Sequence, residues 1–402
     1  MKLPTSGPFR LFLGMALVSN LGSWVQLFTE QWVVLGLAGA EAARWGGRLG
    51  FASGLAILIF TPFGGSLADR FDRRKALALA QGWLMLLALA MGLLALRPGG
   101  LTLPRLMGFG VASGIGAALS LPMIQGLIAD LVSPEQIPLA LGLWSIQFNI
   151  SRILGPSLAA LAFPWIGAAG NFLLNSLSFL GLVLVTWHLK VPRVVIPAGV
   201  TASYREGFKV FRTDPTLRKV LLLSVVTGLF AWPYFALLPV YGTRYLGVGE
   251  RGVALLLSAF GLGAVLGGLW ASRQPRTAGI WPVLVPFGLF GLGLGLLGGF
   301  PRFYLAAGSL LIMGIAQACF LNAMGSQVQW LAPPHLRGRA NAIYLTGILG
   351  LLPLGNLASG EIAQLLGAQG PRWVMILDGV AMTWVAVWMG LLNLRRPEPN
   401  SH

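Results

Sequence analysis

The sequence predicts an all-α polytopic membrane protein, with about twelve transmembrane helices in two six-helix halves. Hydrophobic residues make up 56% of the chain and charged residues only 10%, and the mean hydropathy is +0.76. A soluble domain carries about a quarter charged residues, so this chain lacks the polar surface that water requires. The apolar stretches are also long, and each spanning helix needs about 20 such residues.

The breaks in hydropathy divide the chain into successive spans separated by short polar links. The predicted spans are 10–37, 45–67, 75–96, 103–130, 137–163, 170–190, 218–241, 251–271, 280–299, 303–331, 338–366 and 372–394.

The longest internal polar stretch predicts a linker at 191–217 between an N-terminal bundle at 1–190 and a C-terminal bundle at 218–402. Within it Tyr204, Phe208 and Phe211 recur at helical spacing beside basic residues, which predicts an amphipathic helix on the inner leaflet.

The basic residues predict the orientation of the chain. Of 28 Lys and Arg residues, 19 fall on one side of the predicted membrane, 8 on the other, and Arg152 falls inside a span. Positive residues favour the cytoplasmic side, so both termini are predicted to be cytoplasmic, with the protein in the plasma membrane. The net charge of +16 therefore indicates topology and contact with membrane lipids rather than a nucleic-acid surface.

Few residues suit catalysis or metal binding. The chain has one cysteine, Cys319, and its histidines, among them His188 and His335, are scattered without an evident acid or thiol partner. No phosphate-binding Walker sequence is present. The sequence therefore predicts neither an enzyme nor a protein with a metal or another cofactor.

A dense charge cluster at 61–75 separates the second and third spans and predicts a tight loop at the cytoplasmic face. Asp69 and Arg73 are four residues apart, a spacing at which two side chains pair on a helix. A plain stop signal at the membrane face is the alternative. The candidate functional residues of the cluster are Gly65, Asp69, Arg70, Arg73 and Arg74.

This stretch resembles the signature G-x-x-x-D-R-x-G-R-R/K of major facilitator superfamily transporters, with Asp72 at the second glycine. The variant is similar to the branch that contains enterobactin and macrolide exporters. The resemblance implies two bundles around a midplane site. It also implies that Asp69, Arg73 and Asp130, the acid that ends the fourth span, form a relay that latches the bundles.

The two halves share a weak repeat. Residues 134–156 and 334–356 align at a constant offset of 200, which places Gly155 over Gly355. A fainter copy of the charge cluster ends at Arg273, with Ser272 where Asp69 stands. The pattern predicts related bundles, of which the second has lost the acid.

The fifth predicted span partly matches the superfamily's antiporter signature, with Gly142, Ser151, Gly155 and Pro156 at its positions. A ladder of small residues with a proline predicts a close, slightly bent helix contact that seals one side of a cavity. Ordinary tight packing is the alternative.

Interior polar residues are the candidates for the substrate cavity. Arg152 shares a helix face with Asn149, and an arginine inside a span must meet a partner or a watery cavity. A buried structural ion pair is the alternative. On the tenth span, Asn322 lies on a further polar face that binds a substrate or joins helices.

Acids within the spans are the candidates for proton coupling. Glu30 continues a polar stripe with Gln26 on the first span, so it can exchange a proton as its surroundings change. Asp378, on the last span, is the second candidate. The alternative for both acids is a residue at the outer rim that reaches water.

These features predict a monomeric, proton-coupled exporter of a hydrophobic or amphipathic small molecule, of the drug, macrolide or siderophore type. The alternatives are a facilitator or importer of a small metabolite or lipid, and a membrane sensor that transports nothing.

Overall fold

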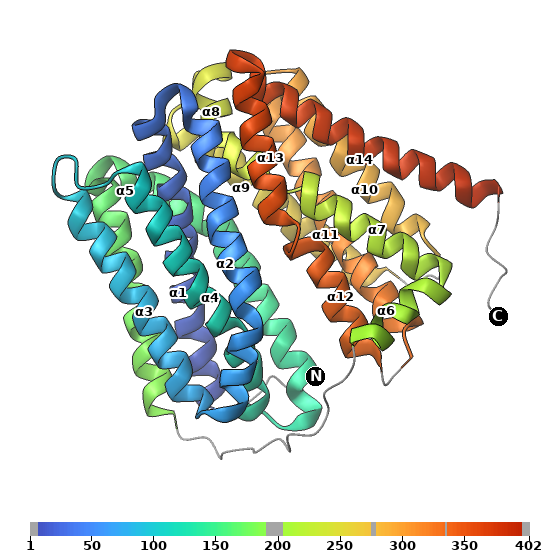
Figure 1. Cartoon of the computed structure of the whole chain (residues 1–402), viewed down its shortest axis with the longest axis horizontal. Helices are drawn as coiled ribbons and strands as arrows, with labels where there is room; N and C mark the ends of the chain where they lie inside the picture. Colours follow the sequence, from blue (N-terminus) through green and yellow to red (C-terminus); the bar gives the residue numbers. More distant parts are fainter. Residues whose placement is uncertain (1–6, 190–203, 275–278, 334–335, 396–402) are drawn as a thin grey trace. The chain divides into compact units, whose positions relative to one another are not determined.

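The computed structural model describes residues 7–189, 204–274, 279–333 and 336–395. The chain forms two compact units, Met1–Gly199 and Val200–His402, which are considered separately below. Helices build all the regular structure of the described residues (Figure 1).

The described part of unit 1 contains five long α-helices, two of which join end to end. They are α1 (Gly7–Ala38), α2 (Ala42–Arg70), α3 (Arg73–Ala95), α4 (Leu103–Leu131) and α5 (Ile137–His188). Only the 3₁₀ turn Gly39–Glu41 separates α1 from α2, and it starts at a glycine with φ of +50°. Within α5, Gly167 has φ of 61° and ψ of −167°, which breaks the helix into two. Such backbone angles favour glycine, so both reversals are set by the sequence.

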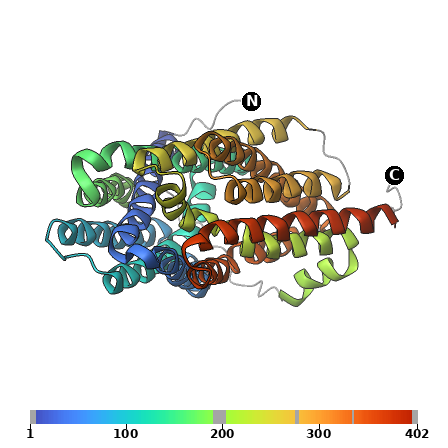
Figure 2. The same ribbon diagram turned by 90° about the horizontal axis from the view of Figure 1, so that it is seen from above.

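The described part of unit 2 contains nine α-helices, several of them shorter. They are α6 (Tyr204–Thr213), α7 (Pro215–Phe230), α8 (Tyr234–Tyr245), α9 (Glu250–Arg273), α10 (Trp281–Gly299), α11 (Phe303–Leu331), α12 (Arg337–Leu349), α13 (Leu352–Leu365) and α14 (Gly370–Arg395). Figure 2 shows the helices of both units from above.

The helices bear out the predicted membrane architecture. Within the described residues, ten helical segments are long and apolar enough to span a membrane. Two of them, Gly7–Gly64 and Pro134–His188, have 58 and 55 residues, whereas one crossing needs about 20. Each is divided at a glycine and is long enough for two crossings, so the ten segments are compatible with the predicted twelve spans.

The tight loop predicted within 61–75 is present, and it is shorter than the charge cluster that predicts it. Helix α2 continues to Arg70 and α3 begins at Arg73, so only Phe71 and Asp72 lie between them. Hydropathy marks where a helix leaves hydrocarbon, not where it ends, and charged residues are good helix formers in water. Asp69 and Arg73 therefore belong to different helices, and the argument from their spacing fails.

The short α2–α3 connection is capped by Asp72. Its carboxylate accepts a hydrogen bond from the backbone N–H of Arg74 at 3.1 Å, so Asp72 is the N-cap of α3.

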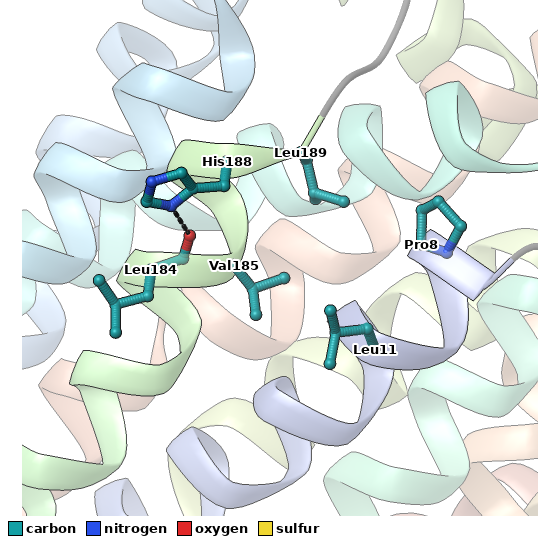
Figure 3. A pocket seen from close by; sticks show the side chains of 6 residues that line it. All are labelled: Pro8, Leu11, Leu184, Val185, His188 and Leu189. Carbon is teal, nitrogen blue, oxygen red and sulfur yellow. Dashed lines mark hydrogen bonds between the residues drawn. The ribbon is translucent and has the colours of Figure 1, made fainter.

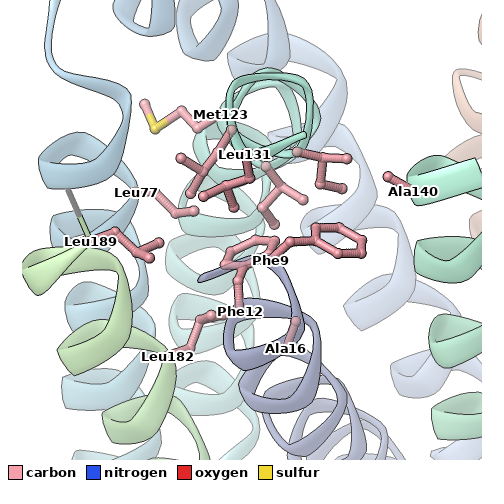
Figure 4. Close-up of a cluster of buried hydrophobic side chains, with 12 residues drawn as sticks. Phe9, Phe12, Ala16, Leu77, Met123, Leu131, Ala140, Leu182 and Leu189 are labelled. Carbon is pink, nitrogen blue, oxygen red and sulfur yellow. The ribbon is translucent and has the colours of Figure 1, made fainter. Parts of the chain in front are cut away.

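The core of unit 1 forms where the early turns of α1 meet α3, α4 and the end of α5. Phe9 and Phe12 of α1 are fully buried there against Leu77 of α3 and Met123 of α4 (Figure 4). Burying an aromatic or aliphatic side chain of this size contributes about 1.5–3 kcal/mol, so this cluster holds the four helices together at one end.

Unit 2 is held together by glycines and aromatic rings. A methyl group at Gly263 of α9 would lie 2.0 Å from the carbonyl oxygen of Leu311, so α9 and α11 touch backbone to backbone. The rings of Tyr234, Phe290 and Phe320 form a buried chain across α8, α10 and α11, with centroids 6.3 and 5.8 Å apart.

Helix α6 falls within the predicted linker at 191–217, of which residues 191–203 lie outside the described part. It packs on α12, because a methyl group at Gly207 would lie 2.9 Å from Arg339 Cβ. Phe211 is buried while Phe208 is exposed. The inner-leaflet placement of its exposed side stays a prediction.

Candidate functional site

An ion pair joins the start of α3 to the end of α4 in unit 1. Arg73 Nη1 donates to both carboxylate oxygens of Asp130 at 3.1 and 3.0 Å, and each side chain is 13% exposed. The guanidinium lies over Gly126, where a methyl group would meet its carbon and nitrogen atoms at 3.1–3.2 Å. Two of the three residues of the predicted relay are therefore in contact.

The other predicted members of the charge cluster lie in the last turns of α2. The structure gives the backbone of Gly65, Asp69 and Arg70 as helical, but their side chains lie outside its described part. The neighbouring Gly64 shows how closely this segment approaches α4, since a methyl group there would lie 2.7 Å from the carbonyl oxygen of Ala118. The role of Asp69 in the relay stays a prediction.

Arg74 has a different partner from Arg73. Its guanidinium pairs with Asp72 at 2.6 Å and also donates to the carbonyl oxygen of Leu189, the C-cap of α5. The hydrogen bond between the Arg74 guanidinium and the Asp72 carboxylate holds the pKa of Asp72 below its usual value. Arg74 therefore ties the start of α3 to the end of α5.

The small-residue ladder on α5 packs against α1 over part of its length. A methyl group at Gly155 would lie 2.3 Å from Trp24 Cβ, and the Ser151 hydroxyl donates to the carbonyl oxygen of Leu17 at 3.3 Å. Pro156 is buried, whereas Gly142 has open space around it. The close contact thus includes Ser151, Gly155 and Pro156 but not Gly142.

Glu30 lies in a buried polar network between α1 and α5. Its side chain is 8% exposed, and Oε1 accepts from Gln26 Nε2 at 2.7 Å. Asn175 Nδ2 donates to Gln26 Oε1 at 2.6 Å, which turns the Gln26 amide so that its NH₂ faces Glu30. Ser178 in turn donates to Asn175 Oδ1 at 3.0 Å. The predicted pair Glu30 and Gln26 is thus held by α5.

Sequence reasoning missed the α5 half of this network. Asn171 donates to Thr29 Oγ1 of α1 at 3.0 Å and to the carbonyl oxygen of Ala159 at 3.2 Å. Asn171, Asn175 and Ser178 follow at positions i, i+4 and i+7, so they share one face of a helix. Polar residues at this spacing inside an apolar span would have indicated the network from the sequence.

Two predicted cavity residues lie on the first half of α5. Arg152 is half-buried, and Asn149 donates to the carbonyl oxygen of Ser145 on its own helix at 2.8 Å. Gln147, which sequence reasoning did not select, makes a contact with α1. Its Oε1 accepts from Asn20 of α1 at 3.1 Å.

The candidates in unit 2 differ from one another in burial. Asn322 is exposed on α11 and donates to the carbonyl oxygen of Ala318 at 2.7 Å. Asp378 of α14 is 7% exposed, and its Oδ2 meets no donor in the described part of the chain. Asn322 therefore lies at the surface of unit 2, whereas Asp378 lies in its interior.

Unit 1 also has two hollows beside its helices. One is a small apolar pocket between the first turn of α1 and the last turn of α5, where the His188 ring contacts the Leu184 carbonyl oxygen at 2.9 Å (Figure 3). The other is a groove beside α3, between α2 and α4. Among the described residues, His, Cys, Asp and Glu side chains form no cluster of three that would suit a metal ion.

The fold resembles solved membrane transporters. A bacterial homologue of the human lysosomal transporter Spinster, in an inward-facing and unoccupied conformation, has a TM-score of 0.78 and 17% identity, and the match covers 97% of each chain. At this identity the likeness shows the fold alone, which the chain shares with that protein over nearly its whole length.

The sequence places the chain in a narrower group. Residues 5–401 match the model of the transmembrane secretion effector family, so the chain belongs to this family of major facilitator superfamily transporters. The resemblance found in the charge cluster is therefore confirmed, and the protein is a membrane transporter rather than an enzyme.

Three curated relatives match over most of their length. Multidrug efflux pump Tap of Mycolicibacterium fortuitum is 25% identical, covering 96% of this chain and 97% of its own. Macrolide efflux protein A of Streptococcus pyogenes is 25% identical, over 86% and 87%. Enterobactin exporter EntS of Shigella flexneri is 24% identical, over 86% and 82%.

Proposed function

We propose that this transporter is a proton-coupled exporter of hydrophobic or amphipathic small molecules of the drug, macrolide or siderophore type. The names of the three relatives support the direction and the substrate class. The proposal places the protein in the plasma membrane as a monomer with both termini in the cytoplasm. The bundles 1–190 and 218–402, joined by 191–217, would expose a central cavity to each side in turn.

The observation that carries the coupling proposal is the setting of Glu30. It is a buried carboxyl group whose partner among the described residues is an amide, Gln26, rather than a base. A fixed cation would keep the carboxylate charged throughout the cycle. An amide N–H can donate to an oxygen of either the neutral or the charged carboxyl group, so this contact can persist in both protonation states while the proton leaves when water reaches the site. Glu30 is therefore the first proton-coupling candidate and Asp378 the second.

The remaining site residues are assigned to gating and substrate contact. The Arg73–Asp130 pair, with Asp69, Arg70, Arg74 and Gly65, would form a clasp that favours one orientation of the bundles. Ser151, Gly155 and Pro156 would form the antiporter-like contact, whereas Gly142, the first position of the signature, lies in open space. Asn149, Arg152, Asn322 and Gln26 would face the substrate. An ion pair has two stable states, made and broken, which suits a switch.

The test begins by finding a transported solute. Purified protein is screened by thermal shift against macrolides, siderophores and other amphipathic compounds, and the best stabiliser is used for flux in proteoliposomes. We expect uptake or release of the solute only when a proton gradient is imposed, and its loss in Glu30→Gln.

Glu135→Gln is the matched control, because Glu135 is an exposed acid outside the buried network. We expect this variant to transport as the wild type does. Flux that ignores the gradient, or gradient-driven flux that survives in Glu30→Gln, would remove the coupling assignment. Movement down the solute gradient alone would favour a facilitator.

A further inference from the structure

The groove beside α3 has the form of a binding site for a single lipid chain. It is lined by α2, α3 and α4 and encloses about 520 Å³. Its walls are apolar side chains such as Leu67, Ala76, Leu79 and Leu119. Leu79 is 66% exposed although it lies on a spanning helix, so the groove opens toward lipid.

Both ends of the groove are defined. Trp83 forms the far end, where its indole Nε1 donates to the carbonyl oxygen of Ala112 at 2.9 Å and so crosses from α3 to α4. Lys75 and Asp72 lie at the near end, at the start of α3. From Lys75 to Trp83 the helix rises by about 12 Å, at about 1.5 Å per residue. One leaflet of the hydrocarbon core is about 15 Å thick, so the groove fits a chain from one leaflet rather than a spanning peptide.

The near end carries a positive charge. Asp72 is already paired with Arg74 at 2.6 Å, so these two charges offset each other. The Lys75 ammonium lies 6.0 Å from the centre of the Trp187 ring, and no carboxylate of the described residues is within ion-pair distance of it. An aromatic ring favours a cation near its face but does not neutralise it. Lys75 therefore remains available to an anion.

From this geometry we propose that the α2–α3–α4 groove binds one anionic phospholipid, with one of its acyl chains along Leu79 and Trp83 and its phosphate at Lys75. Under the proposed orientation this end of α3 faces the cytoplasmic leaflet, which is rich in anionic lipid. The bound lipid would bridge α2, α3 and α4 beside the Arg73–Asp130 pair. The inference goes beyond the proposed export activity and does not depend on its direction or its coupling ion.

Native mass spectrometry of the full-length protein tests this site. The protein is released from detergent that contains equal amounts of phosphatidylglycerol and phosphatidylcholine with identical acyl chains, and the retained lipid is identified. We expect preferential retention of phosphatidylglycerol. In Lys75→Ala the ratio of phosphatidylglycerol to phosphatidylcholine should fall about fivefold. Ala76→Phe, which fills the groove, should reduce retention of both lipids.

Lys209→Ala is the matched control, because Lys209 is an exposed lysine of α6 in unit 2. It should keep the wild-type ratio. The thermal stabilisation by phosphatidylglycerol, measured on the same variants, checks that each is folded and should be smaller for Lys75→Ala. Equal retention of the two lipids by the wild type, or an unchanged ratio in Lys75→Ala, would overturn the proposal. So would the same loss in Lys209→Ala.

Discussion

The two units join corresponding helices by different chemistry. In unit 1, α1 and α5 are linked by side-chain hydrogen bonds, including Asn20 to Gln147 at 3.1 Å and Asn175 to Gln26 at 2.6 Å. In unit 2, α7 meets α12 and α13 through glycines. A methyl group at Gly228 or Gly355 would lie 2.4 Å from a carbonyl oxygen of the facing helix. A close helix contact is therefore found in both units, whereas the side-chain hydrogen bonds named here belong to unit 1.

The offset of 200 residues shows where the halves diverged. Gly155 and Gly355 keep a close helix contact in both units. Gln147 corresponds to Gly347, and Asp130 corresponds to Trp330, which is exposed. Small residues are required wherever two backbones touch, so they persist in both halves. Charges are expensive in a membrane, so we expect the gating role to lie with the Arg73–Asp130 pair of unit 1.

The largest expected effect comes from breaking the ion pair of unit 1. Arg73→Ala leaves Asp130 partly buried without its partner, and such a loss costs about 3–5 kcal/mol of unfolding free energy. Unfolding in mixed micelles, titrated with a denaturing detergent, would measure it. The double variant Arg73→Ala/Asp130→Ala should recover part of the loss, because no charge is then left buried.

Arg273→Ala is the control in unit 2, at the exposed end of α9. We expect a change of less than about 0.5 kcal/mol there. Equal losses of unfolding free energy in Arg73→Ala and Arg273→Ala would contradict the comparison. They would mean that the charged residues after α2 in unit 1 and at the end of α9 in unit 2 contribute alike.

The next effect tests the contact that both units share. Gly155→Ala and Gly355→Ala each place a methyl group against a neighbouring helix, and overpacking of this kind costs about 1–3 kcal/mol. Gly142→Ala, on the same helix as Gly155 but in open space, should be neutral or slightly stabilising because alanine favours a helix. Thermal unfolding of the three variants in detergent gives the order. A loss in Gly142→Ala as large as in Gly155→Ala would refute the assigned contact.

A smaller difference in unfolding free energy is expected between variants of two buried amides, Asn175 in unit 1 and Gln317 in unit 2. Asn175→Leu removes the hydrogen bonds to Gln26 and from Ser178 in unit 1, which should cost about 1–3 kcal/mol. Gln317 in unit 2 is 1% exposed, and neither polar atom of its side chain meets a partner in the described part of the chain. Gln317→Met should therefore be neutral or stabilising, by the same unfolding assay. A loss in Gln317→Met equal to that in Asn175→Leu would show that unit 2 holds a polar network as well.

Hydropathy and short motifs predicted much of the fold. A spanning helix must be apolar over about 20 residues, so span positions follow from composition alone. The contact between Arg73 and Asp130 was also implied, through the resemblance that placed an acid at the end of the fourth span. The pairing of Gln26 with Glu30 follows from helix periodicity, since the two are four residues apart.

Contacts between distant segments could not be predicted in this way. Asn175 reaches Gln26 because α5 is broken at Gly167, and the angle of that break decides which face of its second half meets α1. The bond from Arg74 to Leu189 likewise depends on the start of α3 lying beside the end of α5. Helix α2 runs to Arg70, past the predicted span end at 67, because the charges at 69–75 mark the membrane surface, which the helix crosses before it ends.

Proton release on solute binding tests most directly the claim that unit 1 holds the coupling site. The solute that stabilises the protein is added to purified wild type, Glu30→Gln and Asp378→Asn in weakly buffered detergent, and a pH indicator records the protons released. The account predicts release from the wild type and from Asp378→Asn, and none from Glu30→Gln, with solute binding retained in all three. Undiminished release from Glu30→Gln, with loss in Asp378→Asn, would contradict it.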